Sequence, residues 1–132
     1  MPLSRETLKA MDVFLEGIYP ESQALGESLA RVGLKNTQIR NLETLVASTT
    51  RFSEIINFVK NQAGKESGRE KKWRQVAPEM LTRLVGIETQ AHALGQGDNA
   101  AIMEIKLRLA RGWAKQVVAH YLYRKPEEGG DD

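Results

Sequence analysis

Basic residues gather in one short polar segment of the sequence, where they could bind phosphate groups. Residues 61–72, NQAGKESGREKK, contain Gly64 and Gly68 and no apolar pattern, so the segment is predicted to be a loop. Residues 65–74 have a local excess of three positive charges, supplied by Lys65, Arg69, Lys71, Lys72 and Arg74. A flexible basic loop can follow a phosphate backbone, and counterion release would make such binding salt-dependent.

A second group with phosphate-binding chemistry lies on a predicted helix face. If residues 36–59 form one continuous helix, the side turned away from its apolar face carries Arg40, Thr44, Ala47, Arg51 and Phe58. The two arginines would lie about 16 Å apart, the span of a few phosphates, and the aromatic ring could stack on an unpaired base. Alternatively, both arginines are ordinary solvated charges that pair with Glu43 and Glu54, and the ring packs on a neighbouring helix.

The last predicted helix carries a third basic group. Its only polar strip bears three cations at spacings i, i+3 and i+7, namely Arg108, Arg111 and Lys115. This strip could be a second contact for an anionic partner. It could equally be the one solvated side of a buried helix, because the stems of Lys and Arg side chains can cover apolar surface.

The residues that catalysis and metal binding require are sparse. Neither His92 nor His120 has a partner at ligand spacing, and the chain has no cysteine. The segment AGKES does not fit a phosphate-binding loop, because Val59 stands where that pattern needs glycine and Glu66 where it needs Ser or Thr. We therefore expect a protein that is not an enzyme and that holds no metal and no cofactor.

Length and composition indicate one domain. A chain of 132 residues can bury a single core. Charged residues make up 27% of it, but the formal net charge is only +2, so local clusters alone could attract nucleic acid. No apolar run approaches the roughly 18 residues of a membrane helix, and the first residues do not form a signal peptide. We expect a cytoplasmic protein without membrane contact.

The elements that must position these residues are all helices. Apolar residues recur with a period of 3.6, and no alternating strand pattern occurs. The predicted fold is all-α, a compact bundle of about five helices over about 5–17, 20–32, 36–59, 73–94 and 100–124. Residues 1–125 would form this single domain, and residues 126–132 a disordered acidic tail.

Three short motifs carry a resemblance to a known family. They are TQIR at residues 37–40, NQAGK at 61–65 and WAKQVVAHYLYR at 113–124. In these motifs and their order, residues 25–124 resemble the small helical subunit of type III-A CRISPR effector ribonucleoprotein complexes. The chain departs from the family pattern at Asn61, where an aromatic is expected, at Lys65 in place of arginine, and at residues 115–116 in place of an acidic-Ala pair.

The resemblance implies a non-catalytic role in antiviral defence. Copies of such a subunit stack beside the backbone and large subunits, along the channel that holds guide RNA paired to target RNA. Contacts would fall on the RNA backbone, because one subunit must serve any guide sequence. Motif positions and basic clusters together predict RNA contacts at Lys35, Gln38, Arg40, Arg51, Gln62, Lys65, Arg69, Lys71, Lys72 and Arg74, and second-tier contacts at Arg108, Arg111 and Lys115.

Two other interpretations of the sequence stay open. The chain could be the small subunit of another CRISPR subtype, with the same mechanism and different neighbours. It could instead be a helical protein-interaction or regulatory module without nucleic acid, in which the face bearing Arg40 and Arg51 docks on an acidic partner. A small enzyme is the least favoured reading.

Overall fold

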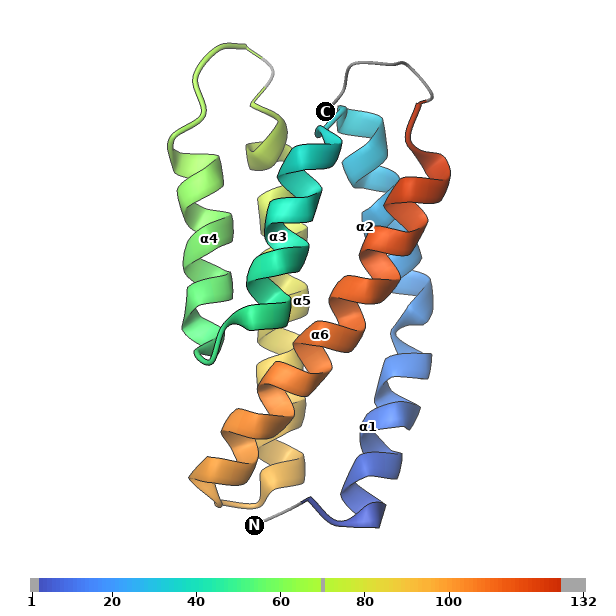
Figure 1. Cartoon of the computed structure of the whole chain (residues 1–132), viewed down its shortest axis with the longest axis vertical. Coiled ribbons are helices and arrows are strands. Elements are labelled where there is room, and N and C mark those ends of the chain that lie inside the picture. Colours follow the sequence, from blue (N-terminus) through green and yellow to red (C-terminus); the bar gives the residue numbers. More distant parts are fainter. Residues whose placement is uncertain (1–2, 70, 127–132) are drawn as a thin grey trace.

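The described part of the chain folds into six helices rather than five. The computed structural model describes residues 3–69 and 71–126, and this part of the chain contains helices and no strand (Figure 1). The helices are α1 (Arg5–Gly17), α2 (Tyr19–Val32), α3 (Asn36–Ser48), α4 (Phe52–Gly64), α5 (Lys72–Gly95) and α6 (Asn99–Arg124). The all-α bundle is confirmed. Of the acidic tail predicted to be disordered, residues 126–132, all but Pro126 lie outside the described residues.

Most helix ends lie where local sequence signals predict them. The Ser4 hydroxyl accepts a hydrogen bond from the amide of Thr7 and caps α1. Gly33 ends α2 in the left-handed conformation, with φ 85°. The Asp98 carboxylate accepts from the amide of Ala101 and caps α6. Pro78 lies inside α5, which starts six residues earlier, at Lys72.

The predicted continuous helix over residues 36–59 is wrong, because the chain breaks between α3 and α4. Thr49 is extended, at φ −72° and ψ 150°, and its hydroxyl accepts a hydrogen bond from the amide of Arg51 at 3.1 Å. The same hydroxyl donates to the Glu54 carboxylate. Threonine side chains that bond to nearby backbone compete with helix formation, and here the alternative bonds prevail.

A long-range contact holds this break in place. Arg111, on α6, donates through Nε to the carbonyl oxygen of Val46 at 3.3 Å and through Nη2 to that of Thr49 at 3.2 Å. Carbonyls at a helix C-terminus have no partner within the helix, and a cation suits the negative end of its dipole. Arg111 therefore caps α3 from a distant part of the sequence.

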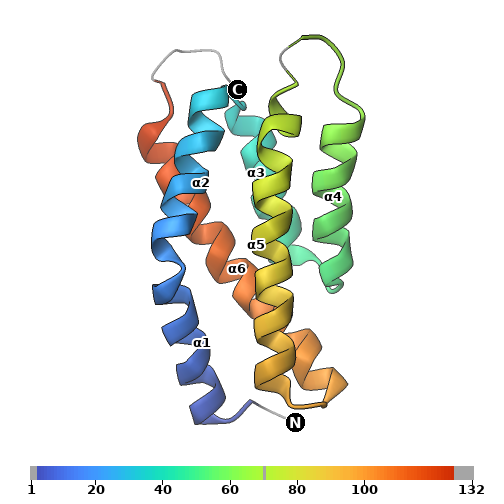
Figure 2. The ribbon, with the colours of Figure 1, turned by 180° about the vertical axis from the view of Figure 1, so that it is seen from behind.

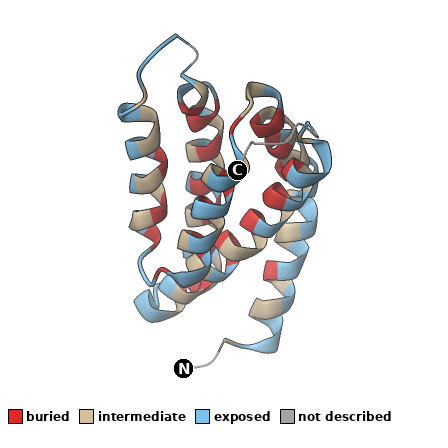
Figure 3. Ribbon diagram, turned by 45° about the horizontal axis from the view of Figure 1, so that its top comes forward, coloured by how far each residue is buried: buried red, intermediate tan, exposed pale blue. Residues whose placement is uncertain are grey.

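Helix α6 is the centre of the bundle. It contacts all five other helices and crosses them diagonally (Figures 1 and 2). Its buried side chains cover more than half of its circumference, as the broad apolar pattern of residues 100–124 predicts, and leave one polar strip at the surface. The largest of them are fully buried, among them Ile105, Trp113 and Tyr121. The burial pattern in Figure 3 places buried residues on the inward faces of the surrounding helices.

Helices α2 and α6 approach each other closely at a glycine. A Cβ atom added to Gly26 would lie 2.7 Å from the carbonyl oxygen of Val117 and 3.0 Å from the amide nitrogen of Tyr121. Near the same level, the Tyr121 hydroxyl donates to the carbonyl of Leu34 at 2.6 Å. These contacts fix how α6 lies against α2 and the loop that follows it.

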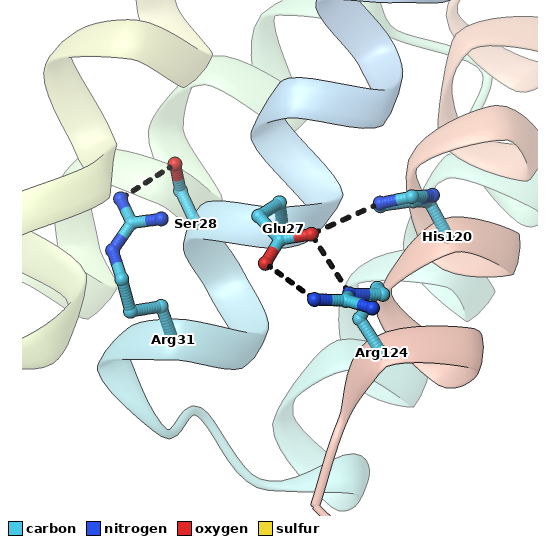
Figure 4. A network of polar contacts seen from close by, with 5 residues as sticks. All are labelled: Glu27, Ser28, Arg31, His120 and Arg124. Atoms are coloured by element: carbon cyan, nitrogen blue, oxygen red, sulfur yellow. Dashed lines mark hydrogen bonds and ion pairs between the residues drawn. The ribbon is translucent and has the colours of Figure 1, made fainter.

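Polar contacts flank this interface at the surface. Glu27, on α2, lies 2.9 Å from Nε of Arg124 and 3.3 Å from Nε2 of His120, both on α6 (Figure 4). Hydrogen bonds from Arg124 and then His120 hold the pKa of the Glu27 carboxyl below its usual value of 4.5. His120 is thus partly buried at the edge of the core, whereas His92 is exposed.

Replacement of Gly26 by alanine should destabilise the protein by about 1–3 kcal/mol, because the new methyl group meets backbone atoms that cannot move independently. Gly86→Ala is the matched control. Gly86 also lies within a helix, but a Cβ there meets nothing within 4 Å. The control should gain about 0.5–1 kcal/mol from the better helix former. Urea unfolding followed by circular dichroism measures both changes; equal effects would contradict the close approach.

Removing the Glu27 charge should change how stability depends on acidity. Because the folded pKa is lowered, the ionised carboxyl stabilises the fold above pH 4.5, and this contribution is lost as pH falls through the lowered pKa. Glu27→Gln should therefore be less stable than the parent at neutral pH, and the difference should shrink in acid. Thermal unfolding at a series of pH values tests this, with exposed Glu16→Gln as control. A difference that is constant with pH would refute it.

Candidate nucleic-acid interface

One end of the bundle gathers most of the predicted RNA-contacting residues. The loop between α2 and α3, the end of α4 and the start of α5 all lie at this end (Figure 1). Nζ of Lys72 donates to the carbonyl oxygen of Gly33 at 3.1 Å, which joins the start of α5 to the end of α2. We call this surface the basic end, and define it by Lys35, Lys65, Arg69, Lys71, Lys72 and Arg74.

The acidic residue in the loop of the basic end serves the fold. The Glu66 carboxylate accepts from the amides of Trp73 at 2.7 Å and Arg74 at 3.1 Å, so it caps α5 from outside the helix. The sequence does not predict this role, because the spacing from Glu66 to Trp73 exceeds that of any local capping motif. The polar segment before an uncapped helix start is the only signal that could have indicated it.

Two cations of the basic end, both on the first turn of α5, make contacts within the fold. Nζ of Lys72 contacts Gly33, as described, and Nε of Arg74 donates to the carbonyl oxygen of Ala63 at 3.1 Å. The three cations in the loop before α5 are exposed, and their side chains make no hydrogen bond or ion pair with the described part of the chain: Lys65, Arg69 and Lys71. Exposed lysine and arginine heads of this kind can move to meet phosphate groups.

Helix α3 starts at the same end and presents two further cations. Lys35 and Arg40 are exposed. Oε1 of Gln38 accepts from the backbone amide of Lys35 at 2.8 Å, so this side chain closes the first turn of α3, and its NH₂ group can donate to a ligand. Gln62 is partly buried on α4. The structure therefore brings the motif residues and the basic loop together.

Arg51 does not join them. It precedes α4 at the far end of α3 and α4 from the basic end, and it forms an ion pair with Glu54. Phe58 packs edge-on against Trp73, with ring centroids 5.9 Å apart and an angle of 83° between the planes. The single face expected to unite Arg40, Arg51 and Phe58 is therefore wrong, because the helix breaks at Thr49 and the aromatic ring is committed to the core.

The basic strip of α6 has mixed roles. Arg108 pairs with Glu104 at 3.0 Å, and Arg111 caps α3. Lys115 is exposed. Surface hollows on either side of α6 share Arg111 and Lys115 among their lining residues, one towards α1 and one towards α3. This strip lies away from the basic end, so the two surfaces are separate candidates for binding.

The described residues show neither a metal-binding cluster nor a membrane-spanning helix. Within residues 3–69 and 71–126, no group of three or more His, Asp or Glu side chains is arranged to hold a metal ion. No helix of this part of the chain is both long and apolar enough to cross a membrane. Comparison with protein-family models, with curated proteins and with solved structures finds no significant match.

The separate roles of Arg111 and Lys115 can be measured. Arg111→Met removes two bonds to carbonyl oxygens at the C-terminus of α3, so it should lower the free energy of unfolding by about 1–3 kcal/mol. Lys115→Met removes the same charge from the next turn of α6, and should change stability by less than about 0.5 kcal/mol. Chemical unfolding compares the two variants. Equal losses would show that Arg111 does not hold α3.

Proposed function

We propose that the chain is a non-catalytic RNA-binding protein that contacts the RNA backbone without regard to sequence. One observation carries the proposal: exposed cations from two chain segments, Lys35 at the start of α3 and Lys65, Arg69 and Lys71 of the α4–α5 loop, lie at one end of the bundle. Lysine and arginine side chains bind phosphate groups well, and contacts to phosphate carry no sequence information. Of the two acids in this loop, Glu66 has both carboxylate oxygens engaged by backbone amides, and Glu70 lies outside the described residues.

The resemblance to type III-A small subunits narrows this proposal. The motif TQIR lies at the start of α3 and contains Gln38 and Arg40. The motif NQAGK lies at the end of α4 and contains Gln62 and Lys65. Both motifs therefore lie at the end of the bundle that carries the basic end. We infer a small subunit of an RNA-guided CRISPR effector, acting in cytoplasmic antiviral defence. Its partners would be guide and target RNA, backbone and large subunits, and further copies of itself. Weak binding by each copy would add up along the RNA.

The arginines near the C-terminal end of α3 are not assigned a primary contact with RNA. Arg51 pairs with Glu54, and Arg111 caps α3, so contacts from either to RNA would compete with bonds that the fold already makes. Exposed Lys115 keeps its charge available. We therefore assign the primary contact to the basic end, with Arg40 at its margin.

Loss of two basic-end charges should weaken RNA binding and its dependence on salt. We expect Lys35→Gln with Lys71→Gln to lower affinity for mixed-sequence single-stranded RNA on the order of tenfold at low salt, and to reduce the salt slope by roughly 1.4. Fluorescence anisotropy across a salt series measures both. The matched control is Arg5→Gln with Lys9→Gln, exposed on α1 at the opposite end. Equal losses in both variants would exclude a local site.

A tagged pull-down from native cells tests the assembly itself. Recovery of repeat-derived guide RNA with several larger effector subunits is the expected result. Recovery of a protein partner without RNA, even at low salt, would overturn the CRISPR proposal and favour the helical protein-interaction module. Guide RNA recovered with subunits of a different complex would place the chain in another CRISPR subtype.

A further inference from the structure

We propose that the surface of α6 between α1 and α3 binds a helix of a partner protein that carries acidic and apolar side chains. Two hollows flank a ridge of cations on α6, formed by residues 108–115. We call the hollows and the ridge together the α6 trough. It lies away from the basic end, so the proposal does not depend on RNA binding.

Long side chains hold the two walls of the α6 trough against α6. Helix α6 crosses in front of α5 in Figure 1, with α1 on one side of it and α3 on the other. Nε2 of Gln116 donates to the carbonyl oxygen of Leu15 on α1 at 3.0 Å. Nε of Arg111 donates to that of Val46 on α3 at 3.3 Å. The trough is therefore formed before any partner arrives, as ligand sites usually are.

Apolar side chains line both hollows. The hollow towards α3 has a volume of about 240 Å³ and is lined in part by Val46, Ala47 and Ala114. The hollow towards α1 has a volume of about 440 Å³ and is lined in part by Leu8 and Leu15. An apolar side chain of a partner that fills such a hollow removes apolar surface of both proteins from water.

The ridge between the hollows offers positive charge. Lys115 is exposed, and its side chain makes no hydrogen bond or ion pair with the described residues. Arg108 lies about 10.5 Å away along the helix axis and is also exposed. Its one ion pair with the described residues is to partly exposed Glu104, one turn away, and surface pairs of this kind are weak. Both cations can therefore meet carboxylates of a partner.

Charge complementarity favours an acidic helix over a nucleic-acid strand at this surface. Asp12 on α1 and Glu43 on α3 line the outer sides of the two hollows. A strand of RNA brings phosphates along its whole length, so like charges would meet at these acids, and it has no aliphatic side chains for the hollows. A helix can present carboxylates along one line, over the ridge, with apolar side chains on both sides of that line.

Selection from a random peptide library tests the proposal without a known partner. Phage-displayed peptides are selected on the full chain and, in parallel, on a variant with Lys115→Glu and Ala47→Glu. The full chain should enrich peptides that combine Asp or Glu with Leu, Ile or Phe, and the variant should not. The same peptides enriched on both proteins, or none enriched on the full chain, would overturn the proposal.

Affinities of a synthetic copy of the most enriched peptide locate the site. Lys115→Glu should weaken binding on the order of tenfold, because attraction becomes repulsion. Ala47→Glu should act similarly, because it places a charge in the apolar hollow towards α3. Lys60→Glu and Ala93→Glu make the same changes at exposed positions of α4 and α5, and should change affinity less than twofold. Fluorescence anisotropy measures affinity, and circular dichroism verifies that all four variants fold.

Nuclear magnetic resonance of the full chain identifies the surface directly. The peptide should shift the amide signals of residues 43–47 and 108–116, and leave those of Lys35 and Lys71 in place. Shifts confined to the basic end would overturn the proposal. Self-association of the chain that Lys115→Glu abolishes would also overturn it, because a second copy would then cover the trough.

RNA binding by the same variants separates this proposal from the proposed function. Peptide binding at the α6 trough of a chain that binds no RNA supports the trough and refutes the proposed function alone. Loss of single-stranded RNA binding in the Lys115→Glu variant, with peptide binding unchanged, would overturn the proposal, because the trough would then be an RNA surface.

Discussion

The packing of α2 against α6 at Gly26 is the contact on which the rest of the structure depends. Helix α6 has apolar side chains around most of its circumference, so it must be enclosed, and Gly26 lets one neighbour approach its backbone directly. This approach brings Tyr121 to the carbonyl of Leu34. The loop that carries Lys35 is thereby fixed relative to the end of the bundle where the basic residues gather.

Some of the long cationic side chains of this protein stabilise the fold, and others face solvent. Arg111 caps α3, Arg74 reaches the carbonyl of Ala63, and Lys72 reaches Gly33. Each bond satisfies a carbonyl oxygen that the helices or loops leave without a backbone partner. The remaining exposed lysines lie on helices and loops that these contacts hold in place. A charged side chain on a helix surface is therefore no guide to ligand binding until its own partners are known.

The distribution of acids explains how a chain with net charge +2 can present a strongly basic surface. Glu66 caps α5, Glu27 binds His120 and Arg124, and Glu54 binds Thr49 and Arg51. These carboxylates neutralise charge locally, at places set by the fold. The exposed cations of the α4–α5 loop keep a local positive potential, which the net charge of the whole chain does not reveal.

The sequence by itself determined the helical class, the ends of α1, α2 and α6, and the enclosure of the last helix, because caps, glycines and apolar period act over a few neighbouring residues. It also indicated which cations could meet at one surface. Only the tertiary structure decided that the helix breaks at Thr49, that Phe58 packs on Trp73, and that Arg111 serves α3. Those outcomes depend on partners far away in the sequence, whose positions no local pattern specifies.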